Sequence, residues 1–354
     1  MTETFVSYSL IAVYSAMAIY TVAFVMFAVD LARRSAESSD AAAASAASAA
    51  SATGLASDSA RSTGMMAAAS SGAASAENAG TGTTTLTRDS DSDSVSDSDA
   101  GANRQHSPKY LRLAMAMTVI AWVLHVGAVV FRGVAANRVP WANMFEFTLT
   151  ATALIVGVFL VVQFVQDLRF LGSFITGFSL MALGVGTTSF YVDVVPLPPA
   201  LQSAWLVIHV FVASLSTGVF ALAAGLSIVQ LMQTHRATGK ALKLRFLDTL
   251  PAAERLETLA YRLTVVGFVM WTFTLMAGAV WAERAWGRYW GWDTKEVWTF
   301  IIWTIYAGYI HARATRGWRG SRSAWLAIVG FSAIVFNFTI VNLFFKGLHS
   351  YSGL

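Results

Sequence analysis

The sequence contains eight apolar stretches that are each long enough to cross a lipid bilayer, which requires about 20 residues of helix. They lie near residues 5–31, 110–131, 146–166, 170–190, 205–232, 261–282, 296–314 and 323–345. All six prolines fall outside these stretches, as expected where helices satisfy their own backbone hydrogen bonds inside lipid. The pattern predicts an all-α integral membrane protein with about eight transmembrane helices.

The amino-acid composition supports this fold class. Charged residues make up 12% of the chain and hydrophobic residues 56%, whereas soluble domains carry about 25% charged residues. A soluble globular enzyme is therefore excluded. The chain contains no cysteine, which excludes disulfides, thiolate metal sites, a cysteine nucleophile and haem attached covalently to this chain.

The basic residues predict the orientation in the membrane. If the N-terminus lies outside, the outer segments keep six of the 24 Lys and Arg residues and the cytoplasmic segments carry the others. The positive-inside rule then predicts a multi-pass protein of the cell membrane with both termini outside. The first stretch lacks a basic segment before it, so we expect a retained helix rather than a signal peptide. The net charge of +4 reflects this topology and indicates no nucleic-acid partner.

A polar segment separates the first helix from the others. Residues 35–107 are almost entirely Ala, Ser, Gly, Thr and Asp, and such residues bury too little apolar surface to offset the entropy of ordering. We therefore expect a first transmembrane helix at 1–31, a disordered cytoplasmic linker at 32–109 and a membrane domain at 110–354. Transient helix is an option for the Ala-rich part, and an inert spacer is favoured over a phosphorylated or partner-binding tail.

Six of the twelve tryptophans lie between residues 281 and 303, in a predicted outer loop and the start of the next helix. An aromatic belt would spread aromatic residues over every helix end, so this concentration favours a platform for a broad, flat, apolar ligand. Arg284, Arg288 and Lys295 would suit acidic groups on its rim. A porphyrin with two propionates has both properties, and its iron would need axial ligands, most often histidine.

Two histidines are predicted on the same outer face as the tryptophans. His209 lies about one turn into the helix near 205–232, and His349 follows the last helix. Each residue alone is more often a polar interfacial residue than an iron ligand. Because both histidines are predicted on one face, the interpretation of the pair as iron ligands is about as good as the interfacial one.

His311 and His125 lie within predicted spans, where an ionisable group is costly and marks a candidate functional residue. Their positions put His311 near the cytoplasmic end and His125 in the outer half of the membrane, about 15 Å apart in depth. They are not expected to hold one iron together, so a second ligand for His311 would come from another chain. For His125, a hydrogen-bonded packing role is an equally good interpretation.

The outer loop at 138–147 places Asn143 and Glu146 at the mouth of the third helix. We expect this loop to support the ligand site. The alternative is a helix cap followed by a first-turn acid, which the helix dipole favours.

The tryptophan-rich segment resembles a known signature. Residues 286–296 are Trp-Gly-Arg-Tyr-Trp-Gly-Trp-Asp-Thr-Lys-Glu, which is similar to the WWD signature of haem-handling proteins. The loop 140–146, the segment 199–209 and the ending Gly-Leu-His-Ser-Tyr from residue 347 are similar to the CcsA/ResC branch of that family, often called CcsB in actinobacteria. The resemblance covers about 110–354 and implies a protein of System II cytochrome c maturation.

The resemblance implies a function and partners. The protein would bring haem b, as a transported substrate, to the extracytoplasmic face of the membrane. There it would form a two-protein cytochrome c synthase with a ResB/Ccs1-type membrane partner and join haem to the Cys-x-x-Cys-His of apocytochrome c. Thioredoxin-like proteins that reduce thiols are further candidate partners.

The resemblance also implies residue roles. His209 and His349 match the family's two outer histidines, which would ligate the haem iron, and His311 matches the histidine of its transmembrane haem site, whose other ligand lies in the partner. The other residues predicted to contact or support the haem are Trp286, Trp290, Trp292, Asp293, Trp298, Arg288, Lys295, Asn143, Glu146 and His125.

The chain differs from the family in a few features, and three alternative functions remain. The 35–107 segment is longer than usual, and Ala142 and Phe145 replace the Ser and Tyr of some relatives. The nearest alternative is a System I haem-handling protein, which shares the WWD signature. An electron-transferring cytochrome b is disfavoured because no two histidines have the required spacing on one helix. A transporter without haem would use the tryptophans as an aromatic belt.

Overall fold

The computed structural model describes residues 2–67, 109–238, 245–315, 317–345 and 347–349, with the backbone alone for 49–67, 200 and 245. Every regular element in these ranges is helical. The prediction of an all-α protein is thereby confirmed. The rest of the predicted linker, at 68–108, and the last residues of the chain, at 350–354, lie outside the described residues.

The chain divides into two units, Met1–Ser35 with Pro108–Leu354 and Ala36–Ser107. α1 (Thr2–Ala67) contributes to both. The sequence predicts that helix ends near residue 31, but α1 continues through the Ala-rich segment. Alanine has the highest helix propensity of all residues, which explains the difference at this boundary.

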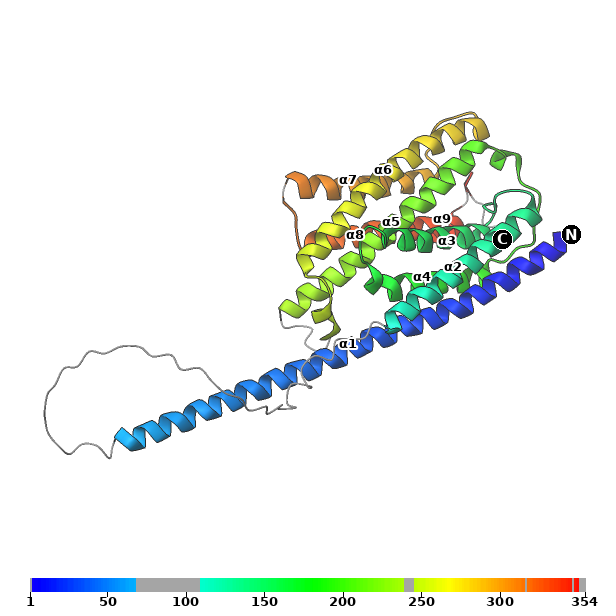
Figure 1. The fold of residues 1–354 in the computed structure, drawn as a ribbon. Coiled ribbons are helices and arrows are strands. Elements are labelled where there is room, and N and C mark those ends of the chain that lie inside the picture. Colours follow the sequence, from blue (N-terminus) through cyan, green and yellow to red (C-terminus); the bar gives the residue numbers. More distant parts are fainter. Residues whose placement is uncertain (1, 68–108, 239–244, 316, 346, 350–354) are drawn as a thin grey trace, which may run out of the picture. The chain divides into compact units, whose positions relative to one another are not determined.

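The larger unit is a bundle of helices (Figure 1). After α1 its long helices are α2 (Lys109–Ala136), α3 (Met144–Val162), α4 (Gly172–Ser189), α5 (Ala204–Ala237), α6 (Ala253–Trp286), α7 (Thr294–Thr315) and α8 (Ser321–Phe338). The short elements are η1 (Arg169–Leu171), η2 (Pro199–Leu201), η3 (Arg245–Thr249) and α9 (Ile340–Phe344).

Seven helices of the described chain are long and apolar enough to cross a membrane, so the protein is a multi-pass membrane protein. The remaining predicted span, at 296–314, corresponds to α7, which has 22 residues but falls short of that apolarity. It nevertheless lies along α6. Trp271 Nε1 donates to Thr299 O at 3.2 Å, and Trp303 Nε1 donates to Thr272 Oγ1 at 3.0 Å. α7 thus packs along α6, as expected for an eighth membrane helix.

α5 packs against α3, α6 and α8 in the middle of the bundle. Every residue from Gly218 to Ser227 is buried, so α5 has no face toward lipid over about three turns. Phe220 stacks on Tyr306 of α7 with 3.8 Å between ring centroids, and it fills the space beside Gly267 of α6. This packing fixes the first turns of α5, which carry His209, relative to α6.

One end of the bundle gathers the residues that were predicted to lie outside, and we call it the site end. Ser9 Oγ, near the N-terminus, donates to Ala128 O of α2 at 2.9 Å. His349, near the C-terminus, contacts Asp293 at the start of α7. The described residues nearest to the two chain ends thus lie at the same end of the bundle, as expected for an even number of crossings.

Candidate functional site

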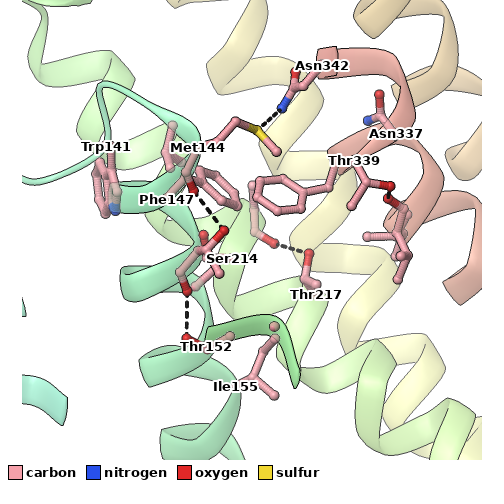
Figure 2. Close-up of a pocket in the computed structure, with 18 of the residues that line it drawn as sticks. Trp141, Met144, Phe147, Thr152, Ile155, Ser214, Thr217, Asn337, Thr339 and Asn342 are labelled. Atoms are coloured by element: carbon pink, nitrogen blue, oxygen red, sulfur yellow. Dashed lines mark hydrogen bonds between the residues drawn. The ribbon is translucent and has the colours of Figure 1, made fainter. Parts of the chain in front are cut away.

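A cavity of about 370 Å³ extends from the site end into the bundle between α3, α4, α5 and α8. This volume lies within the range of about 300–1,000 Å³ that is typical of ligand pockets. Its inner wall is mainly apolar, and Figure 2 shows Phe147 and Ile155 of α3 among the residues that line it. The polar side chains at its site end are Asn143, His209, Lys295, Asn342 and His349.

His209 lines this cavity from the second turn of α5. Its Nδ1 lies 2.9 Å from the carbonyl oxygen of Thr274 on α6. A carbonyl only accepts, so in the neutral imidazole Nδ1 carries the proton and Nε2 keeps a free lone pair. Gly278 makes room for the ring, because a Cβ at this position would lie 2.7 Å from His209 Cε1. His209 is therefore fixed in the tautomer that binds a metal through Nε2.

His349 lines the same cavity and is oriented in the same way. Its Nδ1 lies 2.7 Å from Asp293 Oδ2, an arrangement that holds metal-binding histidines in many proteins. Burial lowers the pKa of His349 and outweighs the opposing effect of Asp293. The hydrogen bond from His349 lowers the pKa of Asp293. At neutral pH the pair is a neutral imidazole held by a carboxylate.

Trp281 of α6 contacts both histidines. Its ring lies nearly parallel to His209, with centroids 5.9 Å apart, and edge-on to His349 at 5.4 Å. Trp286 packs against His349 at 4.8 Å. The structure thus brings the two predicted outer histidines together around one tryptophan.

The turn between α6 and α7 is built by capping contacts at the two helix ends. Gly287 ends α6 in the left-handed conformation, with φ of 71°. Glu296 Oε2 accepts the backbone N–H groups of Gly291 at 2.8 Å and Asp293 at 3.0 Å, which caps the start of α7. Asp293 and Glu296 therefore position this turn, and Asp293 also holds His349.

The four predicted tryptophans lie around the cavity rather than in it. Among the described residues, the tryptophans that line it are Trp141, Trp271 and Trp281. Trp290 packs edge-on against Trp292, and Trp298 packs against Phe336. Trp292 is 73% exposed and has φ of 61°, a strained conformation for a bulky residue. A side chain held exposed at such a cost is a candidate for contact with a ligand or partner.

The two predicted cationic residues differ in position. Lys295 lines the cavity, and its Nζ donates to Asn342 Oδ1 at 2.5 Å. Arg288 is one-third exposed and forms an ion pair with Glu296, with 3.6 Å between Nη1 and Oε1. Lys295 is therefore the cation that can meet a ligand inside the cavity.

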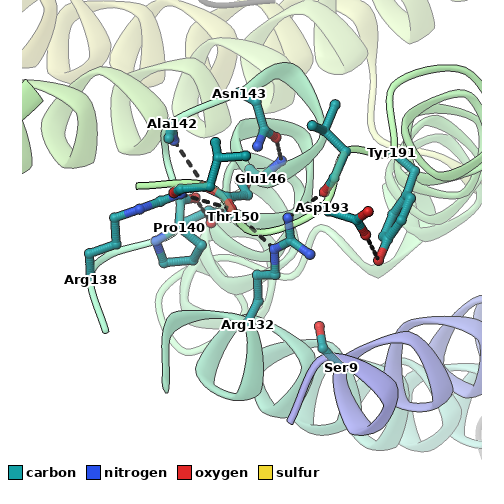
Figure 3. Close-up of polar contacts among 12 residues, drawn as sticks. Ser9, Arg132, Arg138, Pro140, Ala142, Asn143, Glu146, Thr150, Tyr191 and Asp193 are labelled. Atoms are coloured by element: carbon teal, nitrogen blue, oxygen red, sulfur yellow. Dashed lines mark hydrogen bonds and ion pairs between the residues drawn. The ribbon is translucent and has the colours of Figure 1, made fainter. Parts of the chain in front are cut away.

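Asn143 and Glu146 have separate roles at the start of α3 (Figure 3). Asn143 Oδ1 accepts from Glu146 N at 2.9 Å, so the predicted helix cap is present. Glu146 is fully buried and pairs with Arg132 at 3.1 Å and Arg138 at 2.6 Å. Asn143 lines the cavity. Glu146 does not line the cavity, and its ion pair with Arg138 holds the loop between α2 and α3.

The contacts of His125 agree with a hydrogen-bonded packing role, which was one of its two predicted interpretations. It is fully buried, and its Nε2 lies 2.8 Å from Leu149 O of α3. Its Nδ1 lies 3.4 Å from the hydroxyl of Tyr20 on α1. Both ring nitrogens are thus engaged with protein groups.

His311 lies near the opposite end of α7 and is exposed. It is 16 residues beyond Lys295, which corresponds to about 24 Å along the helix. Nearby, Arg313 pairs with Glu257 of α6, and Glu257 also accepts from Gly320 N at 2.9 Å. The structure therefore separates His311 from His209 and His349 and leaves its side chain open to a partner.

Several residues of the site were missed from the sequence. They are Trp281, Gly278, Thr274, Asn342 and the arginines Arg132 and Arg138. Two signals were available. Gly278 precedes Trp281 by three residues and so shares its helix face, and a buried Glu146 requires a buried cation.

Comparison with known proteins places this chain in a family. The model of the family described as "Cytochrome C assembly protein" matches residues 110–349. Cytochrome c biogenesis protein CcsA of Guillardia theta is 34% identical over 240 residues, which cover 63% of this chain and 80% of that protein. CcsA of Synechococcus sp. (strain CC9902) is 41% identical over 179 residues, which cover 44% of this chain and 58% of that protein.

A solved structure shares the fold. Cytochrome c Heme Lyase CcmF superposes with a TM-score of 0.51 at 17% identity, over 66% of this chain and 41% of that chain. At this identity the likeness concerns the fold alone. The family match, by contrast, spans residues 110–349, which include the residues of the site. The chain belongs to the cytochrome c assembly protein family and resembles its CcsA-type members.

Proposed function

We propose that this protein holds haem b as a transported substrate at the site end, with His209 and His349 as the two axial ligands of the iron. One observation carries the proposal: each imidazole donates from Nδ1 to a fixed acceptor and keeps Nε2 free beside the same apolar cavity. Two neutral imidazoles and an apolar wall fit a haem. Lys295 supplies a positive charge for its acidic groups.

In this proposal the site end faces the extracytoplasmic side of the cell membrane, and the protein works in the System II pathway of cytochrome c maturation. The positive-inside pattern of the sequence and the similarity to CcsA proteins support it. The protein acts with a ResB-type membrane partner as a cytochrome c synthase. Its residues hold the porphyrin while two thiols of an apocytochrome c add to the vinyl groups, which is catalysis by positioning.

His311 belongs to an inner haem site in this proposal. Its exposed position on α7 supports a ligand pair that is completed by the partner protein. The buried cluster of Glu257, Arg313 and Ser323 fixes the end of α7 that carries it. Trp286, Trp290, Trp292 and Trp298 offer aromatic surface beside the outer site, and Arg288 adds a cation at its rim.

The test is the absorption spectrum of the protein purified from haem-replete cells with and without a ResB-type partner. We expect a Soret band and sharp reduced bands that the His209→Ala and His349→Ala variants each lose or shift. His235→Ala is the control, because His235 lies at the far end of α5. A colourless wild-type preparation, or a spectrum that neither variant alters, would contradict the proposal.

Replacing Asp293 by asparagine is expected to weaken haem binding about 10- to 100-fold, the usual effect of losing a carboxylate behind a metal-binding histidine. Asparagine caps a helix as well as aspartate, so α7 should begin normally. Haem titration followed at the Soret band measures the effect. Unchanged affinity would show that Asp293 does not orient His349 for the iron.

A further inference from the structure

The site end of the cavity contains two hydrogen-bond donors that have no partner within the described chain. They are Asn143 Nδ2 and Trp141 Nε1, and both residues line the cavity. Asn143 is 5% exposed. A buried donor without an acceptor destabilises the protein, because it loses its hydrogen bonds to water and gains none in return. Such an atom in a cavity therefore points to an acceptor that binds there.

The orientation of the Asn143 amide is fixed by the helix cap. Its Oδ1 accepts from Glu146 N at 2.9 Å, so the atom on the other side of the amide is Nδ2, which only donates. The indole nitrogen of Trp141 also only donates. The missing partner of this pair must consequently be an acceptor rather than a group with its own proton.

The charges around these donors favour an anion. Among the lining residues that the structure describes, Lys295 is the sole lysine or arginine, and none is an aspartate or glutamate. Asn342 accepts from Lys295 and donates to Met144 Sδ at 3.3 Å, which connects this lysine to the first turn of α3. The positive end of the α3 dipole points to the same place.

The buried ion cluster behind Asn143 adds to the positive potential. Arg132 and Arg138 share the single carboxylate of Glu146, so the cluster carries one net positive charge. It lies directly behind the first turn of α3, as Figure 3 shows. Donors without partners, a nearby lysine and a cationic cluster together describe a binding site for a carboxylate.

We propose that Asn143, with Trp141 and Lys295, binds a propionate carboxylate of the haem and so determines which edge of the porphyrin faces α3. This inference rests on the proposed function, because it takes haem as the ligand of the cavity. The two propionates share one edge of the porphyrin. Holding that edge at α3 leaves the edge with the vinyl groups turned away from α3, where the thiols of a substrate can approach.

The test compares two porphyrins that differ in the carboxylates alone. The full chain in detergent is titrated with haem and with haem dimethyl ester, in which both propionates are blocked, and the Soret band gives the two dissociation constants. We expect wild type to bind haem about tenfold or more tightly than the ester, because a charge-assisted hydrogen bond and an ionic contact are lost.

Asn143→Asp is the decisive variant, since aspartate keeps the cap but removes the donor and adds a negative charge. It is expected to weaken haem binding at least tenfold and to leave ester binding within about twofold of wild type. Trp141→Phe should act in the same direction with a smaller effect. Gln202→Glu is the control for added negative charge, because Gln202 lies in an exposed loop and donates to Leu197 O.

Two outcomes would overturn this inference: equal affinity of wild type for the two porphyrins, or an equal loss of both in Asn143→Asp. Failure of the proposed function has a different signature. In that case neither porphyrin gives wild type a spectrum that depends on His209 and His349.

Discussion

Replacing Glu146 by alanine is expected to destabilise the protein by about 3–5 kcal/mol, because it leaves buried arginine charges without a counter-ion. The side chains of Arg132 and Arg138 are 1% and 9% exposed, and Glu146 is the acid that each contacts. Arg132 also donates to Val192 O at 2.6 Å, which links α2 and α3 to the connection after α4. Loss of Glu146 therefore loosens three segments at once.

Thermal unfolding in detergent, followed by size-exclusion chromatography, measures this effect. We expect a melting temperature about 10 °C below that of wild type. Asp167→Asn is the matched control: its ion pair with Arg169 is exposed, with side chains 61% and 39% accessible, and should contribute about 0–1 kcal/mol. Equal melting temperatures for the two variants would contradict a structural role of Glu146 and return it to the residues that contact the ligand.

The helices could be predicted because the signal for each one lies within its own segment of the sequence. A bilayer imposes a length of about 20 apolar residues on each span, and the sequence carries that signal without reference to the rest of the fold. The span predicted at 296–314 appears as α7, Thr294–Thr315, although its polar residues weaken the signal. α1 continues beyond the predicted end of the first span because alanine can continue a helix in the absence of any apolar contact.

The two outer histidines could be proposed from the sequence, but their partners could not. His209 contacts the carbonyl of a residue 65 positions away, and His349 contacts Asp293 across 56 positions. Such contacts depend on how α5, α6 and α7 pack, which the periodicity of one chain does not encode. The same limit applies to Glu146, whose partner Arg132 comes from α2 and whose partner Arg138 comes from the loop after it.

The tryptophans show a second limit. Their concentration between 281 and 303 indicated a ligand platform, but it did not distinguish the side chains that face the cavity from those around it. Trp281 lines the cavity and stacks on His209, whereas Trp292 is held outward by the backbone conformation before the α7 cap. Side-chain direction at a turn depends on φ and ψ, and residue identity alone gives little information about either.

Gly278→Ala is expected to weaken haem binding at least tenfold while the protein stays folded. A Cβ at this position would lie 2.7 Å from Cε1 and 2.8 Å from Nδ1 of His209, distances that force the imidazole to move. The hydrogen bond from Nδ1 to Thr274 O would then lengthen or break. Alanine has a higher helix propensity than glycine, so the backbone of α6 gains about 1 kcal/mol of local stability.

The substitution is expected to stabilise the helix and to weaken haem binding. A general loss of fold therefore cannot explain a loss of binding in this variant. Haem titration at the Soret band measures affinity, and the reduced spectrum reports whether two imidazoles still ligate the iron. Gly127→Ala is the matched control, because Gly127 is also helical and a Cβ there meets nothing within 4 Å. If both variants bind haem as wild type does, the close approach of α6 to His209 does not position the ligand, and the role assigned to His209 would have to be abandoned.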